Sequence, residues 1–224
     1  GYRKRCCLRD VKCHGFGVLM VTGVKMVMVC NQIEPGNCLI ASPMIPMDPN
    51  FYRTVILLTD HEEGLGTSGL VLNQPVPEEH CSVMSKLISG MELKSHFLTG
   101  GPVGTDQAFC LIDTSGTSTT ELVLPDGREI LPGLYQPSDF EETVEAVTAQ
   151  RLSEDRLHFF RGYSGWEAGQ LESELLESVW VMIRSSGDDL LSGARDDLWN
   201  RLLNQSSDSN LRVWSQLPHD DRMN

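Results

Sequence analysis

The sequence lacks an excess of basic residues, a C-x-x-C pair and an apolar run of membrane-spanning length. It carries 18 Lys and Arg against 31 Asp and Glu, a formal net charge of −13 over 224 residues. Nucleic-acid affinity comes largely from basic side chains that neutralise phosphates, so direct nucleic-acid binding is not expected. A bilayer takes about 20 consecutive apolar residues, and Lys25 interrupts the apolar stretch 16–30. We therefore expect no membrane association.

Metal-ligand spacing is also missing. The six histidines form no i, i+4 pair, and HEEGL (61–65) has Leu65 where a metalloprotease motif needs its second histidine. The sequence therefore predicts neither a metal site nor a cofactor. Seven cysteines, an odd number, predict reduced thiols and a cytoplasmic protein.

The chain divides by composition into three parts. Residues 1–36 form an atypical basic segment, residues 37–205 carry the regular strand and helix patterns, and residues 206–224 show little periodicity. We expect one domain over 37–205 and a weakly structured tail over 206–224.

Strand patterns outnumber helix patterns and arrive in clusters. TVILLTD (54–60) and GLVLN (69–73) predict a hairpin around a glycine-rich loop, and ELVLPDGREILPG predicts a second hairpin across Pro125-Asp126-Gly127. A short helix is expected over 81–90, and a longer one over 138–150 with Ser138 as its cap. Because βαβα alternation is missing, the fold class is α+β or a mixed sheet, not a doubly wound parallel sheet.

The stretch GYSGWEAG (162–169) raises the question of a nucleophilic serine. A nucleophile elbow reads G-x-S-x-G, because the sharp turn needs a glycine on both sides. Here Gly165 comes one residue early and Trp166 stands where the second glycine belongs. We interpret the stretch as a glycine-shaped strand-to-helix corner, with a serine hydrolase using Ser164 as the alternative.

GLGTSG (64–69) matches the glycine spacing of a dinucleotide-binding loop. That loop must open a helix, whose amino end holds the pyrophosphate. The residues that follow, LVLNQP, have a strand pattern that ends at a proline. The glycines are therefore assigned to a hairpin loop.

Three longer stretches together resemble the YqgE/AlgH family of bacterial proteins. They are LIASPMIPMDPNFYRTVILLTDHEEGLGTSGLVLNQP (39–75), LTGGPV (98–103) and RGYSGWEAGQLESELLESVW (161–180). The resemblance runs from about Cys38 to about Leu203 and leaves out the first 36 residues. Where the family has a histidine-containing segment after GGPV, this chain has AFCLIDT, so no role for that histidine carries over.

The resemblance implies an α+β fold with a mixed, branched or partly barrel-like β-sheet flanked by helices. It also implies a cytosolic bacterial protein of uncharacterised function, with a transcriptional-regulator role suggested by the AlgH name. It brings no set of catalytic residues, so we lean towards a protein that is not an enzyme.

Polar side chains beside glycine turns give the candidate ligand site. Such turns expose backbone N–H groups, which suit an anion or a peptide segment. The residues expected to converge there are Arg53, Asn73, Gly100, Gly101, Tyr163 and Trp166. The leading hypothesis is a regulatory or binding protein that acts through a protein partner or a small anionic ligand. A direct DNA-binding regulator is a further alternative.

Overall fold

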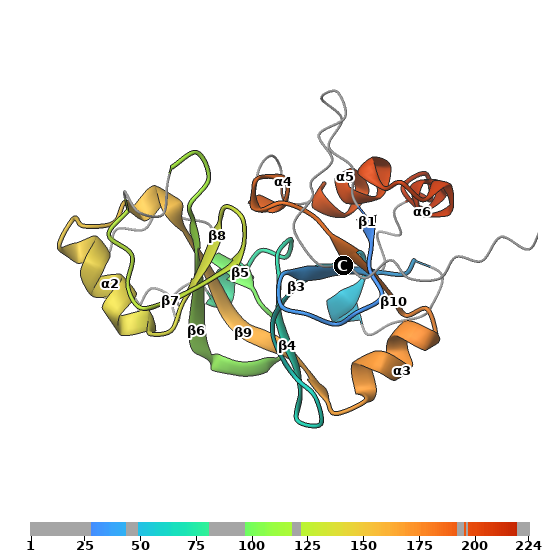
Figure 1. The fold of residues 1–224 in the computed structure, drawn as a ribbon, viewed down its shortest axis with the longest axis horizontal. Coiled ribbons are helices and arrows are strands. Elements are labelled where there is room, and N and C mark those ends of the chain that lie inside the picture. Colours follow the sequence, from blue (N-terminus) through green and yellow to red (C-terminus); the bar gives the residue numbers. More distant parts are fainter. Residues whose placement is uncertain are drawn as a thin grey trace, which may run out of the picture.

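The chain folds around one strongly bent β-sheet with helices on its outer and inner faces (Figure 1). The computed structural model describes residues 28–43, 49–80, 97–117, 122–191, 195 and 197–218. Residues 1–27 of the basic segment and the helix expected over 81–90 lie outside this part of the chain.

The described strands are β1 (Met28–Val29), β2 (Asn37–Ala41), β3 (Val55–Glu62), β4 (Gly66–Val71), β5 (Phe97–Thr99), β6 (Val103–Asp113), β7 (Gly127–Leu131), β8 (Leu134–Pro137), β9 (Leu157–Glu167) and β10 (Trp180–Arg184). The described helices are η1 (Pro49–Phe51), α2 (Phe140–Thr148), η2 (Glu154–Arg156), α3 (Gln170–Leu176), α4 (Gly187–Leu191), α5 (Leu198–Gln205) and α6 (Ser209–Trp214).

The sheet order is β1-β10-β2-β3-β4-β9-β6-β8-β7, and β5 branches from β9. Among the described strands, every neighbouring pair is antiparallel except β5 with β9. The expected α+β class and branched, partly barrel-like sheet are confirmed. The hairpin of β3 and β4 around the glycine-rich loop is confirmed as well.

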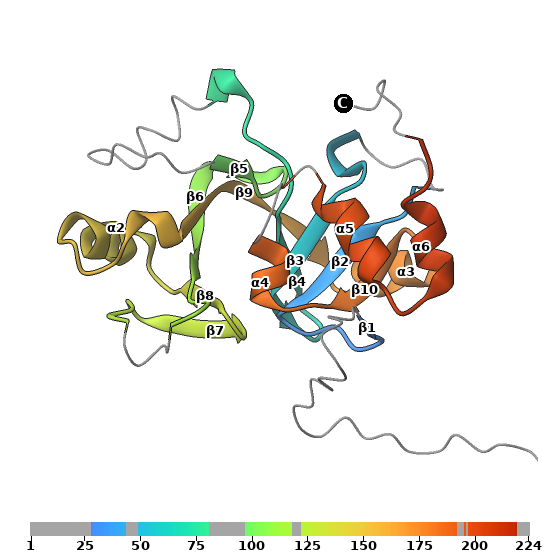
Figure 2. The same cartoon turned by 90° about the horizontal axis from the view of Figure 1, so that it is seen from above.

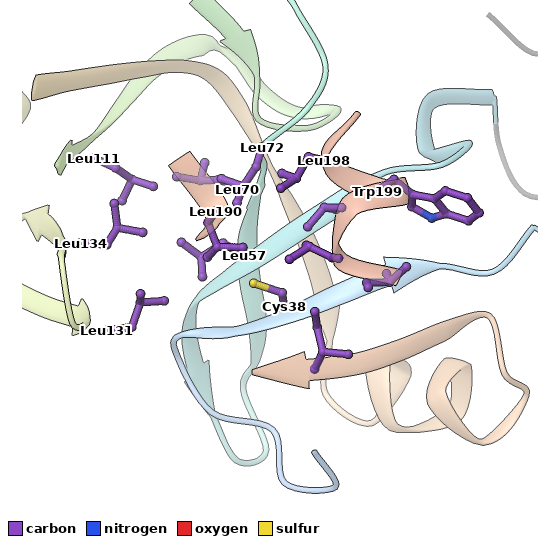
Figure 3. Packing of buried hydrophobic residues seen from close by; sticks show 14 of the residues in the cluster. Cys38, Leu57, Leu70, Leu72, Leu111, Leu131, Leu134, Leu190, Leu198 and Trp199 are labelled. Carbon is purple, nitrogen blue, oxygen red and sulfur yellow. The ribbon is translucent and has the colours of Figure 1, made fainter. Parts of the chain in front are cut away.

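The bend of the sheet brings β7, the last strand in the order, back towards β3. The sheet therefore curls around an apolar interior. Side chains from both halves fill this interior, among them Cys38, Leu57, Leu70, Leu111, Leu131 and Leu134 (Figure 3). Helix α4 adds Leu190 and helix α5 adds Leu198 and Trp199. Since apolar burial is the main favourable term in folding, this cluster is the centre of the core.

Alternation along β2 and β3 divides the core between two faces. Ile40 and Leu57 point to the interior with α4 and α5, whereas Leu39 and Ile56 point to the other face, where Leu171 of α3 packs. Figures 1 and 2 show α4, α5 and α6 on one side of β2, β3 and β10, and α3 on the other. Helix α2 covers the outside of β6 and β9 through Phe140, Val144 and Val147, which confirms its expected apolar face.

Three local expectations are wrong. The second hairpin turns at Pro132-Gly133, because Gly133 supplies the positive φ of 86° that the tight turn needs and Leu131 pairs with Leu134. The cap of α2 is Asp139, whose carboxylate accepts from the N–H groups of Glu141 and Glu142. The expected weakly structured tail contains α6, because Leu211 is an apolar anchor that is buried in the central cluster.

No helix in the described ranges is long and apolar enough to cross a membrane.

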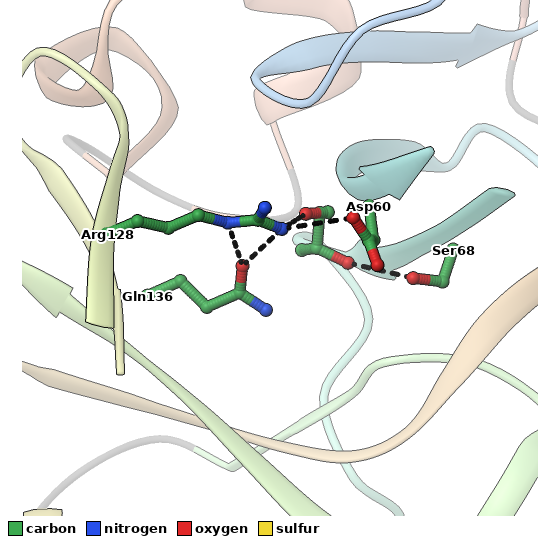
Figure 4. A network of polar contacts seen from close by, with 5 residues as sticks. Asp60, Ser68, Arg128 and Gln136 are labelled. Atoms are coloured by element: carbon green, nitrogen blue, oxygen red, sulfur yellow. Dashed lines mark hydrogen bonds and ion pairs between the residues drawn. The ribbon is translucent and has the colours of Figure 1, made fainter. Parts of the chain in front are cut away.

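Arg128 links β7 to β3 across the opening of the curled sheet. Its Nη2 donates to the carbonyl oxygen of Thr59 and lies 3.3 Å from Asp60 Oδ1, while its Nε faces Gln136 Oε1 at 3.4 Å (Figure 4). The side chains of Arg128 and Asp60 are half-exposed or more, so their ion pair is screened by water. The bond to the Thr59 carbonyl is therefore the main closing contact.

We predict that Arg128→Ala lowers the free energy of unfolding by about 1–2 kcal/mol, because a charge-assisted hydrogen bond to a carbonyl is lost. Asp60→Asn should lower it by about 0.5 kcal/mol or less, as for an exposed ion pair. Urea unfolding of both variants measures the difference. If Asp60→Asn costs as much as Arg128→Ala, the ion pair closes the sheet and this assignment is wrong.

Candidate functional site

Three segments of chain meet at Gly100 and Gly101. The first half of β9 pairs with β5 on one edge and β6 on the other, and its second half pairs with β4. Between these halves, the N–H of Gly100 donates to Arg161 O, and the N–H of Val71 donates to Gly100 O, both at 2.9 Å. We call the contact of residues 100–101 with residues 162–164 the β9 junction.

The β9 junction admits no side chain at its glycines. A Cβ on Gly100 would lie 2.2 Å from Gly162 O, and one on Gly101 would lie 2.3 Å from the carbonyl carbon of Tyr163. Gly162 also has a φ of 65°, which side-chain-bearing residues rarely adopt. Backbone packs directly against backbone here, so these glycines are architectural.

Ser164 lies inside the β9 junction with 1% of its surface exposed. Its Oγ donates to Gly100 O at 3.2 Å, the same oxygen that accepts from Val71. The residues expected to form a strand-to-helix corner are a continuation of β9, which ends only at Glu167. The prediction of a corner at these residues is therefore wrong. Pairing with β4 extends the strand, and the turn into α3 begins at Gly169, with a φ of 79°.

The remaining parts of a hydrolase triad are not assembled in the described residues. His158 is six residues from Ser164 along β9, roughly 20 Å at the rise of a strand. Its Nδ1 accepts from Arg195 Nη2 at 2.5 Å, so that nitrogen faces a cation and not a carboxylate.

The described thiols offer no ready nucleophile in the core. Burial raises the pKa of Cys110 to about 12, and burial likewise raises the pKa of Cys38 far above its usual range. Because only a thiolate is a strong nucleophile, this burial disfavours the reactive form of both groups. Within the described ranges no three His, Cys, Asp or Glu side chains gather as metal ligands would.

Trp166 packs on the α3 face of the sheet. Its ring meets Trp180 edge to face at a centroid distance of 6.1 Å. Glu174 Oε2 accepts from both indole N–H groups, at 2.8 Å from Trp166 and 2.7 Å from Trp180. One carboxylate thus fastens α3 to β9 and β10.

Arg53 lies on the opposite face, over α5. Its guanidinium carbon is 4.8 Å from the ring centre of Trp199 and 5.6 Å from that of Tyr52. Its Nη2 donates to two successive carbonyl oxygens, Leu217 O at 2.6 Å and Pro218 O at 3.0 Å. Its Nε is buried and has no hydrogen-bond partner among the described residues.

Asn73 holds the backbone of Arg53 in place. Asn73 Nδ2 donates to Arg53 O at 2.9 Å, and Asn73 Oδ1 accepts from the N–H of Val55 at 2.8 Å. Arg53 has a φ of 51°, a left-handed conformation that is strained for a residue with a side chain. We call Tyr52, Arg53, Asn73 and Trp199 the Arg53 platform.

The six residues of the expected ligand site therefore fall into three groups. Arg53 meets Asn73 on the Arg53 platform, while Gly100, Gly101 and Tyr163 meet at the β9 junction. Trp166 belongs to the cluster on the α3 face and Arg53 stacks on a residue of the interior cluster. Since the sheet separates Trp166 from Arg53, no single groove holds both.

Sequence reasoning missed Trp199, Leu217 and Pro218. The helical spacing of Leu198, Trp199, Leu202 and Leu203 marks a buried helix face, but nothing in the spacing indicates that Trp199 would carry a guanidinium. Leu217 and Pro218 lie 164 and 165 positions after Arg53 in the chain, so their contacts with Arg53 leave no local signal in the sequence.

Comparison with known proteins gives consistent matches over most of the chain. A family model described as AlgH-like matches residues 38–209. A UPF0301 protein of Chlorobaculum tepidum is 34% identical over 170 residues, which cover 75% of this chain and 84% of the relative. A UPF0301 protein of Bacteroides thetaiotaomicron is 32% identical over 192 residues, covering 84% and 91%.

Solved structures show the same fold. The AlgH protein of Pseudomonas aeruginosa superimposes with a TM-score of 0.58 at 28% identity, covering 85% of this chain and all of that one. Protein DIP2367 of Corynebacterium diphtheriae gives a TM-score of 0.63 at 18% identity, covering 83% and 93%.

The burial of Ser164 predicts that the folded chain is not labelled by a fluorescent fluorophosphonate, because the hydroxyl is neither exposed nor activated. Gel fluorescence after incubation measures this, with a known serine hydrolase as the positive control. Labelling that disappears in Ser164→Ala, while circular dichroism shows both proteins folded, would establish the hydrolase alternative and contradict the structural role.

Proposed function

Because this chain belongs to the AlgH-like family, whose relatives here are named without a catalytic activity, we propose that it is a binding protein that acts through a protein partner. We assign the binding to the Arg53 platform, with Arg53 as the recognising side chain and Asn73 as its positioning residue. The observation that carries the proposal is the pair of main-chain carbonyls already held by Arg53 Nη2.

The chemistry of the Arg53 platform suits an extended peptide. Arginine presents five N–H donors in a planar fork, and its guanidinium also stacks on aromatic faces. Trp199 and Tyr52 provide the faces, and the buried Nε donates to no group among the described residues. Backbone strain at Arg53 agrees with a functional position, since strained residues cluster at binding sites.

A carboxylate is a stronger acceptor than a carbonyl for the same fork. Charge-assisted hydrogen bonds are roughly twice as strong as neutral ones, and carboxylates pair with arginine in a bidentate manner. We therefore propose that the partner presents the carboxyl terminus of a peptide to Arg53, a known mode of peptide capture. The small anionic ligand is the simpler version of the same chemistry.

A partner-mediated route also suits the transcriptional role that the AlgH name suggests. Exposed side chains on α2 and α3 include Glu141, Glu142 and Glu172, which repel phosphates, and Glu177 directly follows α3. Nothing described favours a direct DNA-binding role.

The test uses a peptide of sequence SNLRVWSQLP, which copies residues 209–218 and ends in a free carboxylate. We expect this peptide to bind in a manner that depends on Arg53. The same peptide with an amidated end should bind about tenfold more weakly, because the negative charge of the carboxylate is lost. Fluorescence anisotropy of the labelled peptide with the full chain measures both affinities.

Arg53→Lys is the matched variant, since it keeps the charge but loses the planar fork. It should weaken binding of the carboxylate peptide about tenfold or more, and Arg53→Ala should abolish it. Inorganic phosphate that competes with the peptide would identify the anion as the ligand. If the full chain binds neither peptide, or binds both equally in Arg53→Ala, the proposal fails.

A further inference from the structure

The carboxyl-terminal residues of this chain occupy the Arg53 platform. Helix α6 follows α5 after a short turn, and Leu217 and Pro218 then reach Arg53. The residues of the Arg53 platform lie inside the stretch matched by the AlgH-like family, 38–209, whereas Leu217 and Pro218 lie outside it. The Arg53 platform thus lies within the family match, and the two residues whose carbonyls cover it lie beyond that match.

The covering segment is held by local contacts, among them the packing of Trp214 against the central cluster and the hydrogen bond from Arg212 Nη1 to Ser206 O at 2.6 Å. Leu211 is its buried anchor, and Asp208 caps α6 by accepting from the N–H of Asn210 at 2.8 Å. Ser215 Oγ donates to Asn204 Oδ1 at 2.7 Å, which ties the segment to α5. Helix α6 is only 6 residues long, so it depends on these contacts and not on its own helix propensity.

We propose that residues 209–218 are an internal competitor that occupies the Arg53 platform until a partner displaces them. This inference rests on the proposed function, since it concerns the regulation of the same site. The internal segment offers Arg53 two neutral carbonyls, so a partner that offers a carboxylate makes the stronger bond to Arg53 and competes with the segment for the platform. When the segment is docked, the partner cannot bind. The apparent affinity for the partner is therefore the intrinsic affinity multiplied by the fraction of molecules in which the Arg53 platform is open.

Variants that loosen the segment and leave the four residues of the Arg53 platform unchanged test this. Asp208→Ala removes the cap of α6 and should tighten binding of the carboxylate peptide about fivefold, the factor that corresponds to a typical cap. Leu211→Ala removes the anchor and should tighten binding by tenfold or more. Val213→Ala changes an exposed residue of the same helix and is the matched control, with no change expected.

Hydrogen exchange supplies the second readout. In the free chain the N–H groups of Gln216 and Leu217 donate to Val213 O and Trp214 O, so they should exchange slowly. Adding saturating carboxylate peptide should speed their exchange, because the internal segment is released. A peptide that binds elsewhere would leave that exchange unchanged.

The outcomes separate the two proposals. If the peptide binds in an Arg53-dependent manner but equally well to wild type, Asp208→Ala and Leu211→Ala, the proposed function stands and the internal competitor is refuted. Arg53 then only anchors the residues that follow α6. If no variant binds the peptide, both proposals fall. Should Leu211→Ala fail to fold, as judged by circular dichroism, Asp208→Ala decides alone.

Discussion

The close backbone contact between residues 100–101 and residues 162–164 is the constraint on which the rest of the fold depends. It is the point at which β9 stops pairing with β5 and starts pairing with β4. Where the sheet branches, backbone packs directly against backbone. A side chain at position 100, 101 or 162 would collide with a neighbouring main chain, so only glycine fits there. Ser164 completes the contact by giving Gly100 O its second donor. The serine that suggested a nucleophile therefore serves the branch.

Branching and bending of the sheet place the two conspicuous aromatic sites on different faces. On the α3 face, Trp166 and Trp180 share Glu174, which consumes both indole donors in holding the helix. On the other face, Trp199 donates its own N–H to Ala41 O at 3.0 Å and leaves its ring to Arg53. The first arrangement is complete within the domain, whereas the second relies on the carbonyls of Leu217 and Pro218, which follow the short helix α6. That difference is the physical reason for placing the binding role at Arg53.

Local chemistry predicted much of this structure from the sequence. The β-branched apolar run TVILLTD and the glycines of HEEGLGTSG were enough for the hairpin of β3 and β4, and spacing alone identified the apolar face of α2. The turn of the second hairpin was placed at Pro125-Asp126-Gly127, whereas the register of β7 with β8 places it at Pro132-Gly133, seven residues later. The candidate site was half recovered: Arg53 and Asn73 do meet, but the side of the sheet on which Trp166 lies depends on the register of β9 with β4.

The most direct test of the central claim is the equilibrium unfolding of Gly100→Ala beside Gly64→Ala. Gly64 has a φ of 80° and open space around its Cβ position, so its substitution costs only about 1 kcal/mol of left-handed strain. Gly100 has an ordinary φ, and its added methyl group would collide with Gly162 O and Leu70 Cδ2. The account predicts that Gly100→Ala is at least about 2 kcal/mol less stable than Gly64→Ala, in keeping with overpacked sites. Equal stability of the two variants would contradict it.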